Sequence, residues 1–245
     1  MKNKYEKLGI KQVVRLEWFE KTVALVRSGM TIAEIRKELN EYLSTRKQSG
    51  GQGTRGEKTY GMAISVLAPW FSPSADLVEF RDELLKYTES QQLPLHWALV
   101  SAAYPFWFNV ATHVGRLLNL QEQITQRQIF SRLSEQYGDR ETVARNARYT
   151  VRSFVAWGVL KDSKTRGCYE KGLVMDLPNQ NVASLMLEAG LRSTPEGKSA
   201  LGVLLNSPGF FPFRFPMITG DFLLLNNSRI DVVRYGSGDE LLTIK

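Results

Sequence analysis

The sequence predicts a mainly α protein that ends in a small mixed α+β unit. Apolar residues recur at helical spacing through most of the first 157 residues, and Gly or Pro interrupts the pattern at several points. A basic turn then joins two short segments with strand character. Further strand patterns, separated by Asn- and Gly-rich turns, follow only after residue 220. The expected regions are 1–70, 71–120, 121–172 and 173–245.

Region 1–70 is expected to be a bundle of three short helices in the order of a helix-turn-helix. Apolar residues from Val13 to Val26 predict the first helix, which Ser28-Gly29 ends. Thr31 caps the second, with Glu34 at the capping-box position. The third covers Glu57 to Leu67 and stops before Pro69.

A basic, glycine-rich segment, 45–56, separates the second and third of these helices. Its Gly51–Gly56 part matches a dinucleotide-binding fingerprint as a string, but that fingerprint requires a preceding strand, and here a helix precedes. We interpret the segment as a mobile basic arm whose glycines let the backbone approach phosphates. Its candidate DNA contacts are Arg46, Lys47 and Arg55. The alternative is a flexible loop without a function.

Region 71–120 is predicted to be helical and largely buried. An amphipathic helix is expected from Asp76 to Tyr87, followed by two apolar helices between Leu95 and Leu120 that meet near Pro105. The apolar stretch Leu93–Val114 carries two prolines and two histidines, so it predicts core helices and not a membrane span. The charged N-terminus shows no signal peptide, and we expect a cytoplasmic protein without membrane contact.

Region 121–172 predicts two helices followed by a hairpin. Thr125 can cap a helix with an apolar stripe, and Gly138-Asp139-Arg140 ends it. A second helix runs from about Glu141 to Trp157. Two strands then flank the basic tip 163–167. The candidate DNA-binding side chains on this unit are Arg140, Arg145, Asn146, Arg148, Tyr149, Arg152, Lys164 and Arg166.

Positive charge is concentrated in the same unit. Residues 125–172 hold ten Arg or Lys against five Asp or Glu, a net charge of +5 in a chain whose total is +7. Such concentration indicates a phosphate-rich partner more strongly than a high isoelectric point alone. Double-stranded DNA is the expected partner, with RNA or protein as alternatives.

Region 173–245 is expected to be a small α+β unit. Helices are predicted from about Asn179 to Leu191 and from Pro195 to about Asn206. The segment Pro208–Pro216 holds four Phe among three Pro. It is interpreted either as a cover for the core or as a docking element for a partner or second copy, through Phe210–Phe215. Strands are expected at Phe222–Leu225, Ile230–Tyr235 and Leu241–Ile244.

Composition and motifs give no indication of catalysis. A single cysteine, Cys168, excludes an internal disulfide and a cysteine-based zinc cluster, and two histidines exclude a His-rich metal site. Cys168 is expected to be exposed or edge-facing on the hairpin. His96 and His113 lie on apolar helices and are interpreted as hydrogen-bonded core residues. We expect no cofactor, no metal and no enzymatic activity.

The helix pattern, the strand Val159-Leu160-Lys161 and the tip Lys164-Thr165-Arg166-Gly167 resemble bacterial winged helix-turn-helix DNA-binding domains. The whole order of regions also resembles the BrxA component of BREX phage-defence systems. That resemblance implies a small, non-enzymatic DNA binder that serves as an accessory in a phage-defence or mobile-element locus. A stand-alone transcription regulator and a protein-interaction scaffold are the alternatives.

Overall fold

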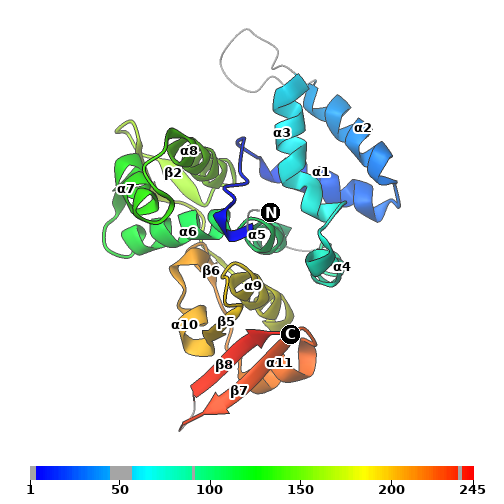
Figure 1. Cartoon of the computed structure of the whole chain (residues 1–245), viewed down its shortest axis with the longest axis vertical. Helices are drawn as coiled ribbons and strands as arrows, with labels where there is room; N and C mark the ends of the chain where they lie inside the picture. The colour runs from blue at the N-terminus through cyan, green and yellow to red at the C-terminus, as the bar shows by residue number, and fades with distance from the viewer. Residues whose placement is uncertain (1–3, 45–56, 90–91, 237–238) are drawn as a thin grey trace.

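A computed structural model describes residues 4–44, 57–89, 92–236 and 239–245. Helices dominate this part of the chain, and the strands are short, so the prediction of a mainly α protein is confirmed. Figure 1 shows α1–α3 on one side, α6–α8 with β2 on the other, and the C-terminal sheet at the far end. Buried apolar residues between Ile10 and Leu242 form one connected core, which runs across the expected region boundaries.

The N-terminal helices follow the predicted pattern. After the short 3-10 helix η1 (Lys4–Glu6) come α1 (Leu16–Arg27), α2 (Ile32–Ser44) and α3 (Glu57–Leu67). Thr31 and Glu34 form the expected capping box: the Thr31 N–H donates to Glu34 Oε2 at 2.8 Å, and the Glu34 N–H donates to Thr31 Oγ1 at 3.3 Å. The residues of the basic arm, including Arg46, Lys47 and Arg55, lie outside the described part of the chain.

The centre of the molecule consists of two apolar helices. They follow η2 (Ala68–Trp70), η3 (Ala75–Leu77) and α4 (Val78–Leu85), and they are α5 (Gln92–Ala103) and α6 (Pro105–Leu118). Trp97 of α5 is fully buried and stacks on Phe154 with ring centroids 5.0 Å apart. No described helix combines the length and the apolar character that a bilayer crossing requires.

His96, also on α5, is fully buried as expected. The hydrogen bond that was also expected for its ring is not formed within the described structure. Neither ring nitrogen has a partner within the described structure, and the ring packs against Phe19 and Trp70. Burial disfavours the charged imidazolium and lowers the pKa of His96 to about 3. The residue therefore packs as a neutral aromatic ring in the core.

The next unit is a helix pair with a three-stranded antiparallel sheet. Its elements are β1 (Gln123–Thr125), α7 (Gln126–Tyr137), α8 (Glu141–Ala156), β2 (Leu160–Asp162) and β3 (Cys168–Lys171). The strand order is β1-β3-β2, with Ile124 opposite Tyr169 and Lys161 opposite Glu170. The N-terminal segment docks on α8, because the Val14 N–H donates to Ser153 Oγ at 3.0 Å and its carbonyl accepts from Trp157 Nε1.

The C-terminal part combines helices with two small sheets. Parallel strands β4 (Met175–Asp176) and β6 (Phe213–Arg214) pair with each other, and α9 (Gln180–Arg192) packs on α5. The second sheet is antiparallel in the order β5-β8-β7. Its strands are β5 (Lys198–Ala200), β7 (Ile230–Tyr235) and β8 (Asp239–Ile244).

Two predicted elements in this part are wrong. Phe222–Leu225 lies in helix α11 (Gly220–Asn226) and not in a strand, because Thr219 caps the helix by accepting a hydrogen bond from the Phe222 N–H at 3.3 Å. The helix expected from Pro195 to Asn206 is divided into β5 and the short α10 (Leu201–Leu205). Residues Lys198–Ala200 form a strand because they pair with β8, a distant segment whose contribution the local helix pattern does not contain.

The Phe/Pro segment Pro208–Pro216 covers part of the core, in agreement with the first of its two interpretations, and this packing buries Phe210 and Phe213 of the candidate docking element Phe210–Phe215. It forms the 3-10 helix η4 (Pro208–Phe210), which packs on α6, and then β6. Phe210 and Phe213 are buried; Phe210 contacts Phe108 at 5.0 Å between centroids, and Phe211 contacts Trp97 at 5.7 Å. Gly115 of α6 allows this close packing, because a Cβ there would lie 2.0 Å from the Pro208 carbonyl oxygen.

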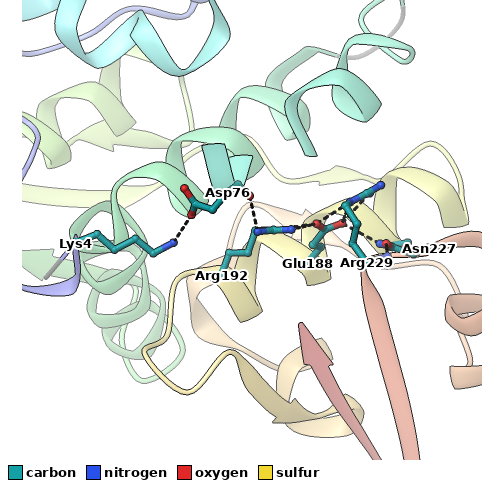
Figure 2. A network of polar contacts seen from close by, with 7 residues as sticks. Lys4, Asp76, Glu188, Arg192, Asn227 and Arg229 are labelled. Carbon is teal, nitrogen blue, oxygen red and sulfur yellow. Dashed lines mark hydrogen bonds and ion pairs between the residues drawn. The ribbon is translucent and has the colours of Figure 1, made fainter. Parts of the chain in front are cut away.

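A buried ion cluster links distant parts of the chain (Figure 2). The carboxylate of Glu188, on α9, is fully buried and accepts hydrogen bonds from Arg192, Arg229 and Asn227 at 2.8–3.1 Å. Arg192 also donates to the Asp76 carbonyl at 2.9 Å, and the Asp76 carboxylate pairs with Lys4 at 3.1 Å. Three hydrogen-bonded partners compensate the loss of water around the carboxylate.

Candidate nucleic-acid interface

The start of α7 is held against the β2–β3 hairpin by local hydrogen bonds. Thr125 and Gln128 form a complete capping box, and the Gln126 N–H donates to the Gly167 carbonyl at 2.8 Å. Gly167 adopts φ +78°, a conformation that favours glycine. Strand β1, which the sequence analysis did not identify, pairs with β3 and fixes this junction. The hairpin tip and the first turn of α7 therefore lie side by side.

An open groove of about 1540 Å³ lies between α7, the later part of α8 and the hairpin. Basic side chains from all three elements line it. They are Arg127 of α7, Arg148 and Arg152 of α8, and Lys164 and Arg166 at the hairpin tip. Acidic side chains in the lining are Glu135, Asp139 and Asp162.

Most of these cations are available to an external partner. Arg127, Arg148, Lys164 and Arg166 are exposed and form no ion pair within the described residues. Arg152 is different, because it forms an ion pair with Asp162 that connects α8 to β2. Four free cations around one groove make a surface suited to an extended anion.

Tyr169 lies on the floor of the groove and adds a polar contact. Burial raises the pKa of its hydroxyl, which the nearby positive charge of Arg152 partly opposes. The hydroxyl stays neutral and donates to Gln126 Oε1 at 3.4 Å. The floor therefore carries a hydrogen-bonding group and no added negative charge.

Three predicted arginines, Arg145, Arg148 and Arg152, lie along one stripe of α8. A helix turns by about 100° per residue, so positions 145, 148 and 152 fall within about 60° of one another. Arg145 is exposed and lies 4.0 Å from Glu141, one turn earlier on the stripe. Tyr149 borders the stripe but is half-buried and packs against the core, so only part of its side chain is accessible.

Asn146 is a correction to the expected interface. It is only 9% exposed, and its Nδ2 donates to the Thr142 carbonyl at 2.8 Å. The next position along a helix is turned by about 100°, which places Asn146 on the flank of α8 that faces the N-terminal segment. A nearby pocket, outside the groove, is lined by both Asn146 and Arg140.

Sequence reasoning missed one residue of the groove and misplaced another. Arg127 counted toward the local charge but was not a candidate contact; its position in the first turn after the Thr125 cap could have identified it. Cys168 was expected to be exposed or edge-facing and is instead buried on the central strand of its sheet, opposite Thr125 in the β1–β3 pair.

Comparison with known proteins gives no further guide to this surface. No protein-family model, curated protein or solved structure matches the chain.

Proposed function

We propose that the protein binds double-stranded DNA through α7, α8 and the β2–β3 hairpin. The observation that carries the proposal is a set of four cations around one open groove that form no ion pair in the described part of the chain: Arg127, Arg148, Lys164 and Arg166. A phosphodiester backbone supplies negative charge at regular intervals, and it is the extended anion that such a set suits.

The order of elements supports the interpretation as a winged helix-turn-helix. Helix α6 is followed by β1, α7, α8 and the β2–β3 hairpin, and α6 packs on β1, α7 and α8. In this interpretation α8 is the recognition helix, which enters the major groove, and the hairpin is the wing, which lies along the phosphates.

The division of labour between base and backbone contacts differs from the sequence-based expectation. Because Asn146 is buried, Arg145 and the exposed part of Tyr149 are the remaining candidates for base edges. Arginine pairs with the N7 and O6 acceptors of guanine, so any sequence preference should favour guanine-containing sites. Arg127, Arg148, Lys164 and Arg166 are assigned to phosphates.

Fluorescence anisotropy with a labelled duplex, at several salt concentrations, tests the proposal. Four phosphate contacts predict that log affinity falls with log salt at a slope of about −3.6. Affinities for unrelated duplexes, for the matching RNA duplex and for single-stranded DNA separate the alternatives. Absence of binding at about 50 mM salt would contradict a DNA-binding function.

The resemblance to BrxA extends the proposal to a non-enzymatic accessory of a phage-defence or mobile-element locus. In that role binding should be nearly independent of sequence. A transcription regulator would instead show a defined footprint, so protection mapping on random genomic fragments distinguishes the two roles.

A further inference from the structure

A second, smaller pocket lies on the opposite flank of α8 from the groove. Its volume is about 560 Å³, within the range of small-molecule sites. Its walls come from the N-terminal segment, from α3, from the start of α6 and from the first turns of α8. Elements far apart in the sequence therefore meet around one cavity.

The N-terminal wall is held in place by close packing and a hydrogen bond. Gly9 adopts φ +71°, and a Cβ at this position would lie 2.5 Å from the Tyr104 ring. The Tyr104 hydroxyl donates to the Ser65 carbonyl of α3 at 2.6 Å. Lys7 and Lys11, on either side of Gly9, thus line the cavity from a segment with a defined path.

Charge in this pocket favours an anion. Lys7, Lys11 and Arg140 line it against a single acid, Glu6. Neither lysine forms an ion pair within the described residues. The first turn of α8 adds to this preference, because Arg140 provides no side-chain cap and the first N–H groups of a helix have no acceptor within it.

Asn146 supplies an independent indication of a ligand. Its side chain lines the pocket and is nine-tenths buried. Its Nδ2 donates to the Thr142 carbonyl, which leaves Oδ1 as a buried acceptor without a partner in the described structure. Buried polar atoms are rarely left unpaired, so Oδ1 calls for a hydrogen-bond donor.

From this combination we infer that the pocket binds a small phosphorylated compound that also carries a hydroxyl or amino group. The phosphate lies between Lys7, Lys11, Arg140 and the start of α8, and the donor pairs with Asn146 Oδ1. This site is separate from the proposed DNA interface, although both use side chains of α8. The protein would therefore bind a small ligand in addition to DNA.

Calorimetry on the full chain tests the inference with three probes: inorganic phosphate, ribose 5-phosphate and AMP. Ribose 5-phosphate and AMP carry donor groups at a distance from the phosphate, so they should bind about tenfold more tightly than inorganic phosphate, the value expected for one good hydrogen bond to a buried acceptor. Asn146→Ala should remove that difference. Lys7→Ala combined with Lys11→Ala should weaken all three probes by about tenfold or more, whereas the exposed control Lys171→Ala should change none.

Each other outcome overturns the inference. If all three probes bind equally and Asn146→Ala does not change their affinities, the lysines attract anions without a defined site. Absence of probe binding, with weaker duplex binding by the lysine double variant, would assign these cations to the DNA backbone. If Asn146→Ala does not fold, Lys11→Glu replaces it, and unchanged probe affinity in that variant would equally contradict the pocket.

Discussion

Removal of the two hairpin cations is the most direct test of the groove as a DNA-binding surface. Lys164 and Arg166 are exposed, line the groove and form no ion pair within the described residues, so their loss should change the surface and not the fold. Each phosphate contact contributes about 0.9 to the salt slope. Lys164→Ala with Arg166→Ala should reduce the slope from about −3.6 to about −1.8.

The same relation gives the loss of affinity. At about 0.1 M salt each lost contact weakens binding by about eightfold, and the pair by about sixtyfold. At about 0.02 M salt the loss for the pair exceeds a thousandfold by the same relation, because the counterion term grows as salt falls. Anisotropy titrations of a labelled duplex across this range measure both quantities.

Lys161→Ala with Lys171→Ala is the matched control. Both lysines are exposed on the same hairpin but do not line the groove, and the double variant loses the same net charge. The control should retain nearly the original slope. An equal loss of DNA affinity in both double variants would show that only net charge matters. An unchanged salt slope in the Lys164→Ala, Arg166→Ala variant would refute contact between the hairpin and phosphates.

Three further predictions concern stability. Between pH 6.5 and about 3 the unfolded chain binds a proton at His96 that the folded chain excludes, so the unfolding free energy falls as the pH drops. His96→Phe should remove about 2 kcal/mol of this fall at pH 5, measured by urea unfolding. The same pH dependence of the unfolding free energy in the variant and the original protein would contradict the prediction. Glu188→Gln should lower the unfolding free energy by about 3–5 kcal/mol, whereas the exposed control Glu196→Gln should leave it almost unchanged. Equal effects of the two substitutions would refute a stabilising role for the buried cluster. Phe210→Ala should lower the unfolding free energy of the monomer by about 3–5 kcal/mol. Loss of self-association with unchanged stability would instead support docking through Phe210–Phe215.

Local signals determined most of the helices from sequence alone. Thr31 with Glu34, and Thr125 with Gln128, form capping boxes because the interacting groups are only three residues apart. The hairpin was predictable for a similar reason, since its strands are joined by a short basic turn that ends at Gly167. The concentration of positive charge in 125–172 also needs no tertiary information.

Tertiary contacts decided what the local pattern could not. Strand β1 forms only because β3 lies beside it, and β5 only because β8 does, so neither has a strong signal of its own. The Phe/Pro segment lacks periodicity, yet α5 and α6 provide the apolar surface that covers it. Glu188 meets Arg229 across 41 residues, a pairing that spacing along the chain does not indicate.

The candidate interface shows the same division. Sequence identified the helix and the hairpin, because charge and periodicity are local properties. It could not tell which side chains of α8 face outward, since docking of the N-terminal segment on Ser153 and Trp157 covers one flank of that helix. Arg148 therefore lines the groove with Arg127, whereas Asn146 lies in a different pocket, and only the packing of distant segments separates the two.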